Sequence, residues 1–318
     1  MKTIAIASMF CMLIACGQND KKNINIQLTP YDSLLLSKLE ENSKHKKIKY
    51  SIVVTSKLPY RLEINDIFAG EHIVPGPRRE LNSNTHYRLD NYILGNGTYK
   101  AKFYFYPHED PRKSGDGLIR QKDLDALDVI IMRYEEYNGI KENISLYKQL
   151  TFTTTEAVPF LEQEIEFTIE DLPYKIKGWS QSQDLRKMDP KKLEEEVVAY
   201  YKYLRDLMNN GKNDVFIYKE QKTKYLEAAT MLYFNREEYE NMLRNNASRG
   251  QNKINNMYPI ENYRISIEAQ GRLVKLYRTD KKYLNQDVLI YKDDKYIHNI
   301  AVRLHKPIGS ETFEIITK

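Results

Sequence analysis

The chain has 318 residues, with 49 lysines and arginines against 44 aspartates and glutamates, which gives a net charge of +5. So small a charge over this length excludes the strongly basic surface typical of nucleic-acid-binding proteins. The length predicts about two domains. Tyrosine, at 25 residues against 10 phenylalanines, favours a β-rich protein.

The N-terminal residues predict a secretion signal. Lys2 supplies a positive charge, and the apolar run from Ile4 to Ala15 is shorter than the about 20 residues that a membrane-spanning helix needs. The run ends in Leu13-Ile14-Ala15-Cys16-Gly17, which resembles the lipobox of bacterial lipoproteins. An ordinary signal peptide with an incidental cysteine is the alternative. The position of Cys16, at the step from apolar to polar sequence, favours the lipobox.

The resemblance implies a lipid-anchored protein of the bacterial cell envelope. Residues 1–15 would be removed between Ala15 and Cys16, and Cys16 would carry diacylglycerol and an N-acyl chain such as palmitate. Several acyl chains give stable membrane attachment. Gly17, in place of aspartate, favours the outer membrane, on its periplasmic or surface face. Residues 16–45 are expected to form a tether that contains a short helix.

Residues 46–178 alternate apolar and polar side chains, as half-buried strands do. Tyr50, Ile52 and Val54 share one face of the first such strand. A turn at Gly95-Asn96-Gly97 interrupts the alternation, because glycine and asparagine tolerate positive φ. About seven strands are expected, and they resemble an antiparallel, immunoglobulin-like β-sandwich. Six of the segments are Tyr50–Val54, Leu58–Ile64, Tyr99–Phe105, Val129–Tyr134, Tyr147–Thr155 and Glu162–Glu170, with a loop at Val74–Pro77.

Residues 186–318 change first to a helical period. Asp189 and Pro190 predict a helix start, and Leu193, Val197 and Leu204 lie on one helical face. Further helices are expected over Val215–Tyr233 and, after a cap at Asn235, over Arg236–Asn245. Trp179, near the boundary, is expected to pack between the two domains.

A meander of strands is expected to follow the helices. The overall fold class is therefore α+β, with C-terminal helices packed on an antiparallel sheet. This half loosely resembles cystatin-like or NTF2-like folds. The expected strands are Tyr263–Ile267, Leu273–Tyr277, Val288–Tyr291, Ile300–Leu304 and Phe313–Ile315.

No catalytic or metal-binding motif is present in the sequence. His108-Glu109-Asp110 with Asp116, and Asp123 with Asp125 and Asp128, could offer metal ligands. Charged loops of this kind are more often simply solvated, so no metal and no cofactor is expected. His298 is expected to be a hydrogen-bonded core histidine, on the opposite strand face from His305.

Three functions are compatible with these features. The favoured one is a non-enzymatic binding or assembly module in the envelope, with another envelope protein, a glycan or a toxin as partner and the membrane reached through the lipid anchor. An envelope hydrolase with a pocket in the C-terminal domain, and a purely structural protein, are the alternatives. Tyrosines are enriched at binding hot spots, so the ligand-binding candidates are Tyr263, Tyr277, Tyr291 and Tyr296.

Overall fold

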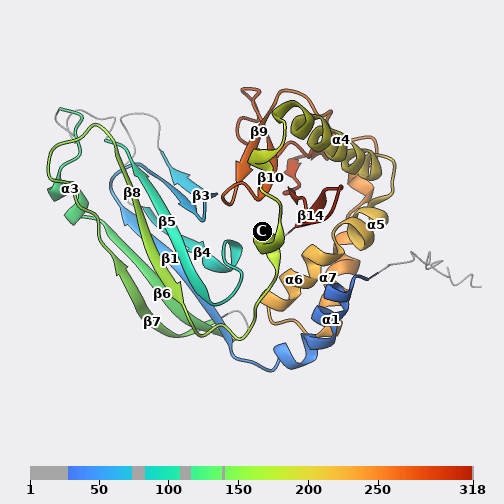
Figure 1. Ribbon diagram of the computed structural model, residues 1–318, viewed down its shortest axis with the longest axis horizontal. Coiled ribbons are helices and arrows are strands. Elements are labelled where there is room, and N and C mark those ends of the chain that lie inside the picture. The colour runs from blue at the N-terminus through green and yellow to red at the C-terminus, as the bar shows by residue number, and fades with distance from the viewer. Residues whose placement is uncertain (1–27, 74–82, 108–115, 138–139, 317–318) are drawn as a thin grey trace, which may run out of the picture.

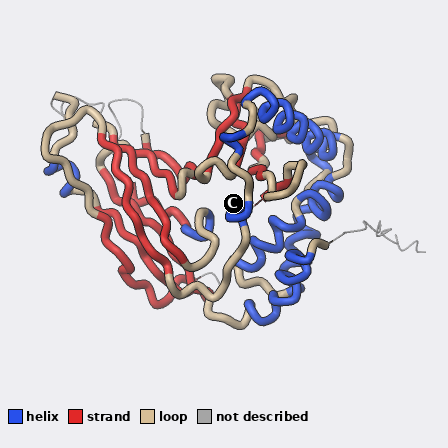
Figure 2. The backbone as a smooth tube through the Cα atoms, viewed as in Figure 1, coloured by secondary structure: helices blue, strands red, loops and turns tan. Residues whose placement is uncertain are grey.

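The protein folds into a β-sheet half and a helix-rich half that lie side by side (Figure 1). The computed structural model describes residues 28–73, 83–107, 116–137 and 140–316. Figure 2 shows the strands of the first half gathered on one side and most helices on the other. The predicted α+β class is confirmed.

Two four-stranded antiparallel sheets build the first half, and their facing side chains form one hydrophobic core. Ile52 and Val54 of one sheet and Leu62 and Phe103 of the other are fully buried there, as the alternating pattern predicts. The first sheet has the order β4-β1-β6-β7, with β1 (Lys47–Ser56), β4 (Ser83–Arg88), β6 (Asp128–Tyr137) and β7 (Ile140–Leu150). The second has the order β3-β2-β5-β8, with β2 (Tyr60–Ile64), β3 (Ile67–His72), β5 (Gly97–Phe105) and β8 (Leu161–Ile169).

The predicted turn at Gly95-Asn96-Gly97 is confirmed. Gly95 has a φ of 150°, and an added Cβ would lie 2.8 Å from the carbonyl oxygen of Tyr174. Asn96 fixes the turn, because its side chain bonds both the carbonyl oxygen and the N–H of Leu172, at 3.1 and 2.8 Å. The expected Val74–Pro77 loop lies outside the described residues.

Strands β3 and β4 were not predicted, since neither shows a clean apolar alternation. The predicted strand from Tyr147 in fact begins at Ile140 and ends at Leu150. Short helical turns complete this half: η1 (Leu89–Asn91) and α3 (Gln121–Asp125).

The helices of the second half begin where their caps predict. Asp189 accepts a hydrogen bond from the N–H of Lys192 at 2.9 Å, and Asn235 accepts one from the N–H of Glu238 at 2.9 Å. The expected single helix over Val215–Tyr233 is interrupted by one π-helical turn, Phe216–Glu220. The helices are α4 (Pro190–Asn209), α5 (Asn213–Val215), α6 (Lys222–Met231) and α7 (Arg236–Ser248), followed by the 3₁₀ turn η5 (Gln251–Lys253).

The expected C-terminal meander is split into two sheets. The main sheet has the order β14-β13-β10-β9, with β9 (Tyr263–Glu268), β10 (Leu273–Arg278), β13 (Arg303–His305) and β14 (Glu314–Ile316). A separate hairpin pairs β11 (Ile290–Lys292) with β12 (Ile297–Asn299). The predicted Ile300–Leu304 strand therefore begins only at Arg303.

Helix α1 (Pro30–Asn42) belongs to the second half, although it precedes the sandwich in sequence. Thr29 and Asp32 form its capping box, and Leu35 and Leu39 are buried in the core of the second half. Asn42 donates to the carbonyl oxygen of Thr230 at 2.7 Å. The stretch expected as a tether thus contains a helix that is packed into the fold.

The two halves share a hydrophobic boundary. Trp179, Met231, Tyr233 and Leu273 join the core cluster of the sandwich. The connecting segment, with turns η2 (Gly178–Gln181) and η3 (Leu185–Lys187), is bonded to the second half; for example, the N–H of Leu185 donates to Gly271 at 2.7 Å. The expected packing of Trp179 between the halves agrees with this geometry.

Candidate functional site

The four candidate tyrosines do not gather in one place. Tyr263 donates to Glu194 of α4 at 3.0 Å, whereas Tyr277 is buried and donates to Glu268 at 2.9 Å. Tyr263 pairs with Arg278 and Tyr277 with Arg264 in the β9–β10 ladder, so neighbouring pairs send the two tyrosines to opposite faces.

The other two tyrosines lie on the separate β11–β12 hairpin. Tyr291 stacks on His298, with ring centroids 4.7 Å apart, and the side chain of Tyr296 is exposed. A single tyrosine-lined binding face is therefore absent among these four residues, and only Tyr277 contributes to the cleft described next.

A cleft of about 380 Å³ lies between the two halves of the protein. One wall comes from β2 and β3 of the sandwich, and the other from β9, β10 and the loop after β10. We call it the junction cleft; its lining residues are Arg61, Phe68, Gly70, Glu71, Arg264, Ser266, Glu268, Tyr277 and Asn285. Clefts between domains are common positions for ligand sites.

One guanidinium group reaches the junction cleft from each half, and each lies over aromatic rings. Arg61 lies 5.1 Å from the ring centroid of Phe68 and pairs with Glu63 at 2.5 Å. Arg264 lies 4.7 Å from the ring centroid of Tyr277 and donates to Asn285 at 3.3 Å. Within the described part of the chain, Arg264 has no carboxylate partner. The remaining N–H groups of its guanidinium can therefore donate hydrogen bonds to an acidic group.

A buried ionic network adjoins the cleft at Glu268 and Tyr277, which both line it. Glu268 accepts from Tyr277 and from Arg303, the latter at 2.7 Å, and Lys275 pairs with Asp287 at 2.5 Å. Burial lowers the pKa of Lys275, an effect that the charge of Asp287 opposes. Burial and the nearby Glu268 raise the pKa of Tyr277, which keeps its hydroxyl protonated as a donor. Buried ion pairs and hydrogen bonds of this kind hold their side chains in fixed positions.

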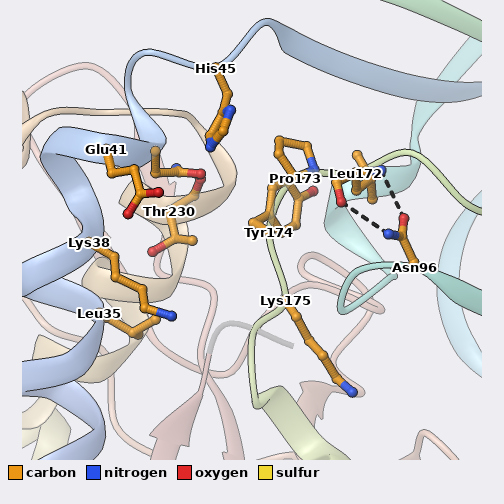
Figure 3. Close-up of a pocket in the computed structure, with 11 residues that line it drawn as sticks. Leu35, Lys38, Glu41, His45, Asn96, Leu172, Pro173, Tyr174, Lys175 and Thr230 are labelled. Carbon is orange, nitrogen blue, oxygen red and sulfur yellow. Dashed lines mark hydrogen bonds between the residues drawn. The ribbon is translucent and has the colours of Figure 1, made fainter.

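A second cleft, of about 410 Å³, lies between α1 and the chain around Tyr174. Figure 3 shows Lys38, Glu41 and His45 on one side and Lys175 on the other. Leu35, Leu172 and Pro173 also line it. No buried ionic network among the residues that line it fixes these charged groups, so the junction cleft is the better candidate site.

A serine, a histidine and a glutamate come together near the connecting segment, but they do not form a hydrolase site. The hydroxyl of Ser182 lies 2.8 Å from Nδ1 of His305, and Glu314 lies 3.9 Å from Nε2, which is beyond hydrogen-bond distance. Ser182 is only 1% exposed, so a substrate cannot reach it. The contact ties the connecting segment to β13.

The other sequence candidates also have structural roles. Asp116 pairs with Arg120, and Asp123 accepts from the N–H of Arg120 at 2.9 Å. Asp125 accepts from Gln121 at 2.8 Å and Asp128 from Gln149 at 3.2 Å. His108-Glu109-Asp110 lies outside the described residues. Across the described ranges, no three His, Cys, Asp or Glu side chains are arranged to hold a metal ion.

His298 does not occupy the core position expected from its sequence. Its side chain is 37% exposed and lies 2.5 Å from a carboxylate oxygen of Asp293. His298 and His305 lie on separate strands that belong to different sheets, so the strand alternation used to place them does not run through both. His305 is the more buried of the two.

Comparisons with protein-family models, with curated proteins and with solved structures give no match. Within the described residues, none of the helices has the length and apolarity to cross a membrane. Cys16 and Ala15 lie outside those residues.

The sequence offered no signal for Arg61 and Arg264, because strands far apart in the chain bring them to one cleft.

Proposed function

We propose that this protein is a lipid-anchored component of the bacterial cell envelope that binds a partner without chemical turnover. The junction cleft carries the proposal, since it combines two guanidinium groups that lie over aromatic rings with an adjoining buried ionic network. Arginine stacked on an aromatic ring suits a planar acidic group. The partner in this view is another envelope protein or a glycan that presents a carboxylate.

The anchor is proposed from Leu13-Ile14-Ala15-Cys16-Gly17, with the outer membrane favoured by Gly17. Replacing Cys16 by serine is expected to abolish lipid attachment, because the thiol that would carry diacylglycerol is lost. Metabolic labelling with a palmitate analogue checks this result. Equal labelling of the wild type and Cys16→Ser would contradict the anchor, while Cys11→Ser serves as the matched control that keeps its label.

Partner capture tests the junction cleft. The chain from Gly17 onward, which retains every described residue, is used as bait against native envelope extract. Arg264→Gln is expected to weaken capture by about tenfold or more, since a hydrogen bond to a charged group contributes about 1.5–3 kcal/mol. Arg264→Lys, which keeps the charge but loses the planar fork, should retain an intermediate amount.

Arg244→Gln is the matched control for this experiment. Arg244 is an exposed arginine on α7 and bonds Asn241 and Glu240 of its own helix. The Arg244→Gln variant should capture the partner as the wild type does. Equal capture by Arg264→Gln and the wild type would place binding elsewhere. Hydrolysis of an envelope substrate by the purified protein would instead support the enzymatic alternative.

A further inference from the structure

Strand β7 presents an open edge with apolar side chains. It pairs with β6 on one side, and no other described strand pairs with it. Ile140, Ile144 and Leu146 are 64%, 56% and 62% exposed. Figure 1 shows β7 on the outer flank of the sandwich, away from the helices of the second half. An exposed edge of this length with large apolar side chains offers a template for another strand.

The sequence of β7 is complementary to itself when two copies run antiparallel. A two-fold axis perpendicular to the paired strands must pass through a residue that faces its own symmetry mate, because hydrogen-bonded and non-hydrogen-bonded pairs alternate along the ladder. With Ser145 on the axis, Ile144 faces Leu146 of the second copy. In the same register Glu142 faces Lys148 of the second copy.

The neighbouring registers lose this match. With Ile144 on the axis, Glu142 would face Leu146 and Lys141 would face Tyr147. Opposite charges and apolar pairs directly across a ladder stabilise pairing, whereas mismatched pairs do not. The register centred on Ser145 is therefore the one that the side chains favour.

The charged pair is free to form in this register. Glu142 has no ion pair within the described ranges and is exposed. Lys148 donates one hydrogen bond, to the carbonyl oxygen of Glu166 at 2.7 Å, and an ammonium group has three N–H donors. Each dimer would contain this pair twice, once on either side of the axis.

Two irregularities of β7 also coincide in this register. The β6–β7 ladder shifts between Ile131 and Met132 and again between Arg133 and Glu135, next to Tyr147 and Asn143 on β7. Asn143 has a φ of 49°. In the register centred on Ser145, Asn143 faces Tyr147 of the second copy, so the bulged positions meet each other and leave Ile144, Ser145 and Leu146 as the central pairs.

We propose that β7 is a self-association edge, through which two copies of the chain pair their first sheets antiparallel about Ser145. The interface is small and belongs to the class of weak, reversible contacts. The contact does not involve the junction cleft, so the self-association proposal does not depend on the ligand proposed for that cleft.

A disulfide tests the register directly. The chain from Gly17 onward contains no cysteine, so Ser145→Cys introduces a single thiol. Directly opposed residues on an antiparallel pair lie within disulfide reach. Under mild oxidation, Ser145→Cys should form a covalent dimer much faster than Gln149→Cys, whose thiol would face Lys141. Equal rates for the two variants would overturn the register.

Charge exchange tests the association itself by sedimentation velocity, from low micromolar to several hundred micromolar protein. Glu142→Lys should weaken dimer formation at least about fivefold, because both charged pairs become like-charged. The double variant Glu142→Lys with Lys148→Glu should restore it. Glu156→Lys, an exposed change of equal charge outside β7, should leave it unaltered. A protein that stays monomeric at every concentration, or an unrestored double variant with native circular dichroism, would overturn the proposal.

Discussion

Replacing Tyr233 by alanine is expected to lower the free energy of unfolding by about 3–5 kcal/mol, the usual range for deleting a buried aromatic side chain. Tyr233 is fully buried between the two halves. Its ring packs edge-on against Tyr174, with centroids 5.8 Å apart, and the ammonium of Lys49 lies 5.1 Å from its centroid. Its hydroxyl donates to the carbonyl oxygen of Ile48 at 2.9 Å. Urea unfolding followed by circular dichroism measures the loss.

Tyr233→Phe separates the ring from the hydroxyl. It keeps the packing and the unusual backbone angle of this position, a φ of 58°, and removes only the hydrogen bond. The expected loss is about 1 kcal/mol. The wild type should unfold in one transition, because the boundary is continuous with the core of the sandwich. A loss below about 1 kcal/mol for Tyr233→Ala would show that the ring contributes little to the boundary.

Acidification from pH 6.5 to 4 is expected to destabilise the fold through His305. Burial, aided by the charge of Lys177, lowers the pKa of His305 from 6.5 to about 4. A base with a depressed pKa in the folded state contributes stability that is present above its unfolded pKa and is lost as the pH falls toward the folded pKa. The shift corresponds to about 3 kcal/mol at full protonation.

His305→Asn isolates this contribution. The asparagine amide can replace Nδ1 as the partner of the Ser182 hydroxyl but does not titrate. The difference in unfolding free energy between the wild type and the variant should therefore shrink between pH 6.5 and 4. Burial raises the pKa of the nearby Glu314, which acts with the opposite sign, and this group is present in both proteins. A difference that is independent of pH would contradict the prediction.

Local signals predicted the parts of the fold that depend on neighbouring residues. The caps Asp189 and Asn235 are read from one helical turn, and the Gly95 turn from three residues. The strand alternation correctly placed Tyr50, Ile52 and Val54 in the core. These features are decided within a few residues of the chain, so the sequence contains them directly.

Features that need contacts between distant segments could not be predicted. Lys49 follows the polar side of the β1 alternation, yet its side chain is only 2% exposed. Its ammonium donates to Met231 of α6 at 2.6 Å and pairs with Asp90 at 3.3 Å. The junction cleft is likewise built from β2, β3, β9 and β10, and nothing local marks Arg61 or Arg264 as neighbours.

The two ends of the described chain close the same half of the protein. Helix α1 packs against α6 and α7, and β14 completes the main C-terminal sheet, while the sandwich is inserted between them. When the chain folds from its N-terminal end, the sandwich strands can pair once Ile169 is present, but α1 must wait for helices that follow it by some 190 residues, as the Thr223–Asp32 bond illustrates. Until then Leu35 and Leu39 stay exposed on a lone helix too short to be stable alone. The first described helix in the sequence is thus among the last to be packed, and a chain that ends before α6 would leave its apolar side chains without a packing partner.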